Sequence, residues 1–375
     1  MLHQTPSATA RPISRLCPPP LLRLSRVVPR LRHHLSSRSQ PNPAAAPSFH
    51  RLHMASAPLP IHLILDWDGT LTAKDTLHFL GQISNEHAVR DVSPPSSSWD
   101  DIVKAYVDDL NAHTQAYRPS ASERNTIAEE KAWLASLEGV DLRSVKRVED
   151  AGLFAGVTAN NVSQGASKAV GSGQLKLRKG WENLLFRNEG NEGNLLSHIS
   201  ILSVNWSATF IREALLHAAY DTKVLQSSEM NADALRRTMQ NMDIFANEFE
   251  GLNRLNGSSG RLSKSGERGI RTSEDKLERM PIPRKYGGDE LVIYVGDSCT
   301  DLEALLAADV GICIRDEPMG SGQRELAEAL ERIGVPVHRL KLLAEMPPPD
   351  DSRVDLWWTP SLEELSMSLD SLSQA

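Results

Sequence analysis

LILDWDGTLT, at Leu63–Thr72, is a short apolar run that ends in two acidic residues, Asp66 and Asp68. Carboxylates are rarely buried without a partner, so a core strand that ends in two of them indicates a cation or a reactive group nearby. The plainer interpretation is a strand followed by an acidic turn, because Asp and Gly are ordinary turn residues. The chemistry at the other strand ends decides between the two interpretations.

Strands alternate with helices from Leu175 onward, which predicts an α/β fold. The clearest example is Glu290–Val295 (ELVIYV), a buried-strand pattern followed by the turn Gly296–Asp301 (GDSCTD) and a helix at 302–308. Such strands pair in parallel, and helices cover both faces of the sheet. The expected fold is therefore a doubly wound parallel sheet with its functional residues at the carboxyl ends of the strands.

The segment between the first and second strands has a mostly helical pattern. We expect helices at 75–89, 99–117, 121–137, 179–186, 208–220, 232–239, 302–308, 323–333 and 361–369, and further strands at 199–203, 223–226, 242–249, 310–314, 335–337 and 354–358. Gly139 is the expected stop of the helix at 121–137. Because a crossover needs far fewer residues, 74–173 is expected to be an inserted helical module. The core then comprises 59–73 and 174–375, with a flexible Gly- and Ser-rich loop at 251–272.

The composition is that of a globular chain with unevenly distributed charge. The 375 residues are 40% hydrophobic and 24% charged, close to the globular average. Residues 1–65 contain eight Arg and no Lys, Asp or Glu, whereas the remainder has 33 Lys and Arg against 48 Asp and Glu, a net charge of −15. An acidic body argues against a nucleic-acid partner. Cys17, Cys299 and Cys313 have no metal-ligand spacing and favour a reducing compartment.

Residues 1–58 are rich in Arg, Ser, Pro and Ala and contain no acidic residue, which is the composition of an organellar transit peptide. We expect a disordered segment that directs the chain to mitochondria if translation starts at Met1. The alternative is a cytoplasmic protein whose translation starts near Met54. No stretch approaches the ~18 apolar residues of a membrane span, so no membrane partner is expected.

Polar side chains follow several predicted strands or begin the helices beside them. They are Asp66 and Asp68, Ser203, Lys276, and Asp297 with Asp301. The carboxyl ends of neighbouring strands in a doubly wound sheet meet at one crevice, so we expect these groups to share a pocket. Clustered carboxylates repel one another unless a cation neutralises them, and oxygen ligands suit Mg²⁺, the expected cofactor. A metal, an ammonium and a hydroxyl suit a phosphoryl group, with carboxylates left as nucleophile and general acid.

The same residues resemble the four ordered motifs of the haloacid dehalogenase superfamily. The motifs are D-W-D-G-T at Asp66–Thr70, Ser203, Lys276 and G-D-S-C-T-D at Gly296–Asp301, and the match covers about residues 61–369. The resemblance implies a Rossmann-like core, and the insertion at 74–173 resembles the helical cap of the phosphoserine-phosphatase-like branch. ILSVNWSATFIREAL at 201–215, DIFANEFEG at 243–251 and YVGDSCTDLEALLAADVGI at 294–312 resemble a fungal and plant subgroup. That subgroup includes the thiamine monophosphate phosphatase domain.

The resemblance implies a role for each residue that matches a motif. Asp66 is the expected nucleophile, and Asp68 is the expected acid that protonates the leaving oxygen and then activates water. The expected phosphoryl- and substrate-binding residues are Thr70, Ser203, Asn205 and Lys276, and the expected Mg²⁺ residues are Asp66, Asp68 through its backbone carbonyl, Asp297 and Asp301. Lys264 and Lys285 compete with Lys276, although neither lies at a comparable helix start.

The function implied is Mg²⁺-dependent hydrolysis of a small phosphomonoester through an aspartyl-phosphate on Asp66. Asp68 favours phosphoryl transfer, because the members of the superfamily that cleave carbon–halogen bonds lack this second carboxylate. The subgroup suggests thiamine monophosphate as substrate, and phosphoserine, pyridoxal phosphate and sugar phosphates stay open. Two other functions also stay open: a phosphotransferase or mutase, and a non-catalytic regulatory protein that binds phosphate or Mg²⁺. Nothing in the sequence specifies the oligomeric state.

Overall fold

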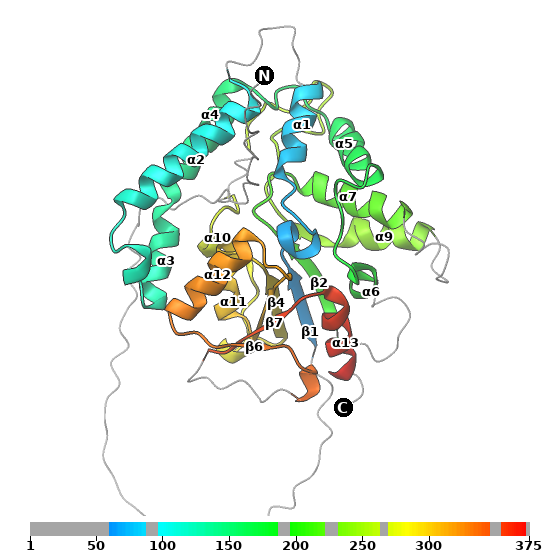
Figure 1. Cartoon of the computed structure of the whole chain (residues 1–375). Coiled ribbons are helices and arrows are strands. Elements are labelled where there is room, and N and C mark those ends of the chain that lie inside the picture. The colour runs from blue at the N-terminus through cyan, green and yellow to red at the C-terminus, as the bar shows by residue number, and fades with distance from the viewer. Residues whose placement is uncertain are drawn as a thin grey trace, which may run out of the picture.

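The computed structural model describes residues 60–87, 97–186, 196–221, 232–262, 269–345 and 354–372. Within them, seven strands form one parallel sheet in the order β3-β2-β1-β4-β5-β7-β6 (Figure 1). The strands are β1 (Ile61–Leu65), β2 (Leu196–Leu202), β3 (Asp243–Phe245), β4 (Leu291–Gly296), β5 (Val310–Ile314), β6 (Val337–Arg339) and β7 (Leu356–Thr359). The predicted parallel α/β sheet is confirmed. The segment 1–58 and the predicted strand at 223–226 lie outside the described residues.

The central strand β1 pairs with β2 on one side and with β4 on the other. The chain leaves β1 toward β2 and β3, and it later returns to β1 with β4 and continues outward to β5. The border between β1 and β4 is therefore the point at which the strand order reverses, where doubly wound sheets form their crevices. Leu63 and Leu65 of β1 and Ile293 and Val295 of β4 are fully buried, as strands covered on both faces require.

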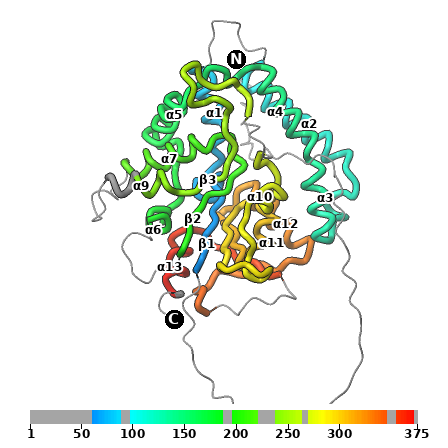
Figure 2. The backbone as a smooth tube through the Cα atoms, turned by 180° about the vertical axis from the view of Figure 1, so that it is seen from behind, coloured from blue at the N-terminus to red at the C-terminus, as the bar shows by residue number. Residues whose placement is uncertain are grey.

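Five helices of the insertion stand between β1 and β2 in the chain. They are α1 (Leu77–His87), α2 (Trp99–Ala116), α3 (Ile127–Ser136), α4 (Glu138–Ala151) and α5 (Ala159–Gly171). The other described helices are α6 (Trp181–Leu185), α7 (Ala208–Asp221), α9 (Ala232–Asn241), α10 (Ser273–Arg279), α11 (Leu302–Ala307), α12 (Ser321–Arg332) and α13 (Leu362–Leu372). Figures 1 and 2 show the insertion as an arch, with α1 and α5 beside α7 at one foot and α3 at the other.

The helix predicted at 121–137 starts later than expected and ends as expected, with its C-cap at Leu137, but Gly139 is not its stop. The chain makes only a short 3-10 turn at Ala121–Glu123, and α3 begins after Thr126, whose hydroxyl accepts a hydrogen bond from the Glu129 amide. Gly139 lies inside α4, which ends instead at Gly152 with a φ of 64°. A glycine stops a helix when it takes this left-handed conformation, and sequence alone does not show which glycine does so.

Aromatic side chains join the insertion to the sheet domain in one hydrophobic cluster. Trp99 of α2 lies edge-on to Trp206, which precedes α7, with ring centroids 6.0 Å apart. Phe154, between α4 and α5, stacks on Phe249 with centroids 4.2 Å apart. Burying each such side chain contributes about 1.5–3 kcal/mol. The insertion is therefore packed continuously against the core and is not suspended from it by two linkers alone.

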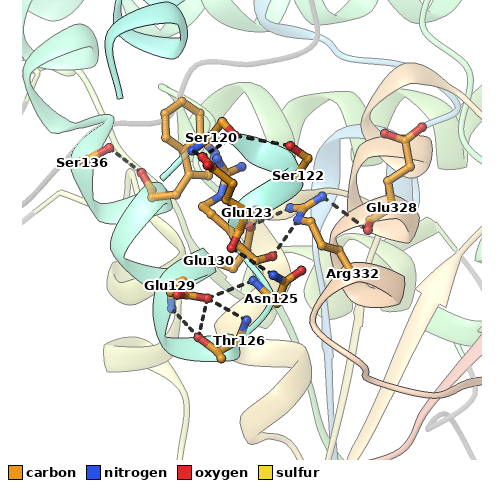
Figure 3. Close-up of polar contacts among 12 residues, drawn as sticks. Ser120, Ser122, Glu123, Asn125, Thr126, Glu129, Glu130, Ser136, Glu328 and Arg332 are labelled. Carbon is orange, nitrogen blue, oxygen red and sulfur yellow. Dashed lines mark hydrogen bonds and ion pairs between the residues drawn. The ribbon is translucent and has the colours of Figure 1, made fainter. Parts of the chain in front are cut away.

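A buried ion-pair cluster fixes the other foot of the arch. Figure 3 shows Arg332 of α12 reaching Glu130 of α3, at a distance of 2.7 Å. Arg124 Nε donates a second hydrogen bond to the same Glu130 oxygen at 2.8 Å, and Arg332 Nε donates to the Arg124 carbonyl at 3.0 Å. Glu130 is only 2% exposed, so removing its charge leaves two guanidinium groups without their partner.

The described part of the loop predicted at 251–272 lies against the insertion. The Ser258 amide donates to the Val157 carbonyl at 2.7 Å, and the Gly156 amide donates to the Ser258 carbonyl at 2.8 Å. These bonds join the loop to the connection between α4 and α5. Residues 263–268 lie outside the described residues. None of the described helices is both long enough and apolar enough to cross a membrane.

Candidate active site

Lys276 is the buried centre of the site at the β1–β4 border. Its ammonium donates to Asp66 Oδ1 at 2.8 Å and to Asp301 Oδ1 at 2.6 Å, and its side chain is fully buried. Asp66 directly follows β1, and its amide donates to the Val295 carbonyl of β4. Lys276 is placed by α10, whose start is capped by the Thr272 hydroxyl and the Asp275 carboxylate. The structure thus brings together three residues that the sequence predicted would share a pocket.

Both oxygens of Asp301 are occupied by protein donors. Tyr294 of β4 donates its hydroxyl to Oδ1 at 2.6 Å, in addition to the bond from Lys276. The amides of Asp297 and Ser298 donate to Oδ2 at 3.1 and 3.0 Å. Asp301 therefore fixes the turn after β4 and holds Lys276. The sequence analysis missed Tyr294, although a hydroxyl inside the otherwise apolar run ELVIYV was a usable signal.

Asp297 is buried, and its Oδ1 has no hydrogen-bond partner among the described residues. Burial and the nearby charges of Asp301 and Asp66 raise the pKa of Asp297 well above its ordinary value. Gly69 lies against this carboxylate with a φ of 77°, and a Cβ at that position would lie 2.2 Å from Asp297 Oδ2. Only glycine allows the two turns to approach this closely.

The negative charge of three clustered carboxylates favours a divalent cation beside them. One oxygen from each of Asp66, Asp297 and Asp301 lies within 4.8 Å of the others. Burial raises the pKa of Asp66 to about 8, with Asp301 and Asp68 adding to the shift and Lys276 opposing it. Burial alone would lower the pKa of Lys276, but Asp301 and Asp66 outweigh that effect and raise it. One ammonium therefore does not balance this cluster, and a hard cation with oxygen ligands would.

Asp68 is held by three hydrogen bonds, two from the start of the insertion and one from the segment after β2. The amide and the hydroxyl of Thr76 donate to Oδ1 at 2.7 and 2.6 Å, and Asn205 Nδ2 donates to Oδ2 at 3.0 Å. Trp67 Nε1 in turn donates to the Thr76 hydroxyl at 3.0 Å. Burial raises the pKa of Asp68, and the bonds from Thr76 and Asn205 partly offset that rise. The sequence analysis missed Thr76, because nothing in the pattern marks it as the partner of Asp68.

Asn205 was predicted to bind the phosphoryl group, and the structure places it on Asp68 instead. Its amide nitrogen donates to Asp68 Oδ2, and its Oδ1 accepts the Ser207 amide at 3.1 Å. Both ends of the side chain are thus engaged within the protein. Ser203 is fully buried at the end of β2, where its hydroxyl accepts the Asn205 amide at 3.1 Å. The buried hydroxyl of Thr70 has no hydrogen-bond partner among the described residues.

Arg178 clamps the turn that carries Asp68, a contact that sequence reasoning missed. Its guanidinium donates to the Thr70 carbonyl at 3.1 Å and to the Gly69 carbonyl at 2.8 Å, and it pairs with the Asp316 carboxylate. These bonds join β1, β5 and the segment before α6 at one edge of the sheet. No motif surrounds Arg178 in the sequence, so its role follows only from the tertiary contacts.

Of the two lysines that compete with Lys276, the structure describes only Lys285. Lys285 donates to the Leu306 and Ala308 carbonyls at the end of α11, away from the carboxylate cluster. Lys264 lies outside the described residues. Cys313 is buried, and its burial raises the pKa of the thiol to about 12, so it is not a reactive thiolate.

Comparisons with known proteins give one sequence relative and several structural likenesses. No family model matches the chain. A phosphoserine phosphatase with a phospho-aspartyl intermediate analogue aligns over 72% of this chain and 90% of its own, at 12% identity and a TM-score of 0.35. A HAD family hydrolase from Salmonella enterica serovar Typhi aligns over 72% of this chain and 66% of its own, at 14% identity and a TM-score of 0.36. The chain is 25% identical over 256 residues to a CTO1 family protein of Schizosaccharomyces pombe, an alignment that covers 67% of this chain and 81% of that protein.

Proposed function

We propose that this chain is a phosphomonoester hydrolase whose nucleophile is Asp66. The observation that carries the proposal is the fully buried Lys276 bridge between Asp66 and Asp301, beside a third carboxylate, Asp297, whose Oδ1 has no partner in the described part of the chain. A structural ion pair needs no further acid nearby. Here Asp68 stands two residues from Asp66 and is held by its own donors, as a nucleophile–acid pair requires.

The two steps follow from the places of the two carboxylates. A carboxylate oxygen of Asp66 attacks phosphorus, and the bond from phosphorus to the ester oxygen breaks as Asp68 gives its proton to that oxygen. The Asp66 acyl phosphate is then attacked at phosphorus by water, whose proton returns to Asp68. Phosphate leaves, and both side chains regain their first state. The raised pKa of Asp68 suits this exchange, because the group must carry a proton in the first step.

Asp66, Asp297 and the backbone carbonyl of Asp68 are the groups that would hold Mg²⁺. When bound, the ion would offset the negative charge of the phosphoryl group and of the carboxylates around it. Asp301 has no free oxygen in the structure, since five hydrogen bonds reach its carboxylate from Lys276, Tyr294, Asp297 and Ser298. We therefore assign Asp301 to positioning Lys276 and the Asp297 turn.

Lys276, Ser203 and Thr70 are the groups that would receive the phosphoryl oxygens. Lys276 supplies the positive charge, and the Thr70 hydroxyl supplies a donor that the described protein leaves unused. Ser203 lies at the end of β2, next to β1 in the sheet. Asn205 acts instead through Asp68, because its amide is already bonded to that carboxylate.

The insertion at 74–173 is proposed to act as a cap that limits the substrate to a small molecule. Its first residues continue directly from the turn with Asp68, and burial, together with the charge of Asp68, raises the pKa of Asp75 to about 8. The resemblance to the thiamine monophosphate phosphatase subgroup makes that compound the first candidate, with phosphoserine, pyridoxal phosphate and sugar phosphates as the others.

The experiment is a phosphate-release screen of the full chain with Mg²⁺ over about fifty metabolite phosphates, a range that pocket discrimination can resolve. At least one compound should release phosphate in the wild type and none in the Asp66→Asn variant. Consumption of a substrate without free phosphate would indicate transfer to another acceptor. A flat profile over the whole screen would contradict hydrolysis and favour a non-catalytic protein.

A further inference from the structure

A second group of ionisable side chains lies at the opposite edge of the sheet from the catalytic residues. It comprises His62 of β1, His198 of β2 and Glu290, which immediately precedes β4. His62 is paired with His198 in the register of β1 with β2. Asp66, directly after β1, lies four residues beyond His62 in the chain, which corresponds to about 13 Å between the two residues at ~3.3 Å per residue of extended chain. The cluster is therefore separate from the catalytic carboxylates.

The two histidines point their Nδ1 atoms at the same carboxylate. His198 Nδ1 lies 3.1 Å from Glu290 Oε1, and His62 Nδ1 lies 3.6 Å from Glu290 Oε2. The imidazole centroids are 5.5 Å apart, and one ligand atom from each of the three residues lies within 4.8 Å of the others. Of the described residues, only this group and the catalytic carboxylates bring three such atoms so close.

We propose that His62, His198 and Glu290 bind a divalent transition-metal ion, with Zn²⁺ as the best match. Zn²⁺ takes imidazole nitrogens and carboxylate oxygens at ~2.0–2.2 Å in tetrahedral sites, which places ligand atoms about 3.3–3.5 Å apart. The nitrogen–oxygen distances of 3.1 and 3.6 Å bracket that spacing. Two histidines and one carboxylate leave the fourth position to water.

Hydrogen bonds around the cluster orient its ligands as metal sites require. His62 Nε2 lies 2.9 Å from the hydroxyl of Ser200, a bond that leaves Nδ1 as the atom facing Glu290. Ser197 donates its hydroxyl to Glu290 Oε1 at 2.8 Å. Partners of this kind fix the ring orientation and tautomer of metal-bound histidines. A surface His–Glu ion pair without a metal does not require such hydrogen-bond partners.

The charge state of the ligands agrees with this geometry. Burial lowers the pKa of His62 although the charge of Glu290 opposes it, and the neutral imidazole is the form that binds a metal. Burial raises the pKa of Glu290, but without a metal the hydrogen bonds from Ser197 and His198 outweigh that effect and lower it; a bound ion would replace the proton that His198 Nδ1 donates. Asp243, at the start of β3, adds a negative charge near His62 that favours a cation at this edge.

The simpler alternative is a structural His–Glu ion pair that binds no metal. The chain offers an internal reference for that case, because His338 lies 3.6 Å from Asp355 with one histidine and one carboxylate. The group at His62 differs because a second histidine contacts the same carboxylate. In addition, Ser200 is hydrogen-bonded to His62, and Ser197 is hydrogen-bonded to Glu290. A bound ion would join the amino ends of β1 and β2 and the start of β4, which brace the strand that carries Asp66.

The test is calorimetric titration of the full chain with Zn²⁺ at a constant excess of Mg²⁺. We expect one Zn²⁺ per chain, with affinity weakened by on the order of 100-fold in both His198→Ala and Glu290→Gln. His338→Ala is the matched control and should bind like the wild type. His198 is 61% exposed, so its truncation should leave the fold intact, which circular dichroism checks.

Co²⁺ supplies a second readout that reports the ligand set directly. The wild type should give the strong visible absorption of tetrahedral Co²⁺, and His198→Ala should lose it while His338→Ala keeps it. Wild-type Zn²⁺ affinity retained in both ligand variants would overturn the proposal, as would the absence of saturable Zn²⁺ binding by the wild type. Neither result bears on Asp66, so the phosphatase proposal and this one fail separately.

Discussion

Lys276 and Asp66 stand 210 residues apart in the sequence and form a buried ion pair of 2.8 Å at the border of β1 and β4. Asp301 accepts from the same ammonium at 2.6 Å, so one buried ammonium is shared by two carboxylates. The pair joins the first strand of the fold to a helix far along the chain, and stability and chemistry therefore depend on the same contact.

Lys276→Met should destabilise the metal-free protein by about 3–5 kcal/mol, because it leaves Asp66 and Asp301 buried without the ammonium that binds both. The variant should also lose activity. Urea unfolding measures the first effect, and Lys104→Met, which breaks an exposed i,i+4 pair with Asp108, is the matched control. Equal unfolding midpoints for Lys276→Met and Lys104→Met would show that the buried bridge does not form.

Asn205→Ala should lower kcat with little change in KM, because Asn205 acts on Asp68 and not on the phosphoryl group. The loss should be smaller than the roughly 10²–10⁴-fold that a general acid contributes, since Thr76 still holds Asp68. Loss of this bond raises the pKa of Asp68 further, so the pH profile of kcat should move to higher pH. A change confined to KM would contradict this role and would indicate that Asn205 binds the substrate directly. Asn253→Ala, at an exposed position, serves as the control.

EDTA-treated protein should lose activity and should become less stable as pH rises. The folded-state pKa of Asp66 is raised from 3.8 to about 8, so the folded chain holds more protons than the unfolded chain between these values. Stability then falls with rising pH across that window. Mg²⁺ replaces the proton as the neutralising charge, so it should restore activity and should raise the Tm more at about pH 8 than at about pH 5.5.

The Asp66→Asn variant is the control for this pH dependence, because it removes one titrating group and should make the slope of Tm against pH shallower, while Asp68 and Asp297, whose pKa values are also raised, keep part of it. Thermal unfolding followed by circular dichroism measures both proteins with and without Mg²⁺. A Tm shift by Mg²⁺ that is the same at both pH values would contradict a cation site built on these carboxylates.

Glu130→Gln should destabilise the protein by about 3–5 kcal/mol, because it leaves Arg124 and Arg332 buried or half-buried without their common anion. The contact joins α3 of the insertion to α12 of the core (Figure 3). Urea unfolding checks the size of the effect. Asp108→Asn, on an exposed surface pair, is the control, and an equally small effect of both changes would show that α3 is not anchored here.

The parallel sheet and the main catalytic candidates could be predicted from the sequence because both depend on local patterns of apolar and polar residues. Asp66 and Asp297 interrupt apolar runs at points where a buried strand should stop, and Lys276 follows a helix cap. Parallel pairing then requires that these ends share one edge of the sheet. The location of the pocket was therefore predictable without knowledge of any side-chain contact.

The partners of those residues were not predictable, because tertiary contacts alone select them. Arg178 carries no motif, yet it binds the carbonyls of Gly69 and Thr70 across 109 and 108 residues of sequence. Asn205 follows a strand, as a residue that binds a phosphoryl group would, but its side-chain amide donates to the Asp68 carboxylate. Gly139 was predicted to stop a helix, but it lies inside α4. Its backbone conformation determines this, and the sequence does not reveal that conformation.

Phosphate release by the wild type and by Asp66→Asn, measured side by side on the best substrate of the screen with Mg²⁺ present, tests the central claim most directly. The account predicts steady release by the wild type and a loss on the order of 10⁵-fold in the variant, with unchanged circular dichroism. Asp66→Asn keeps the size of the side chain, so the fold should persist. Near-normal phosphate release by this variant would contradict Asp66 as the nucleophile.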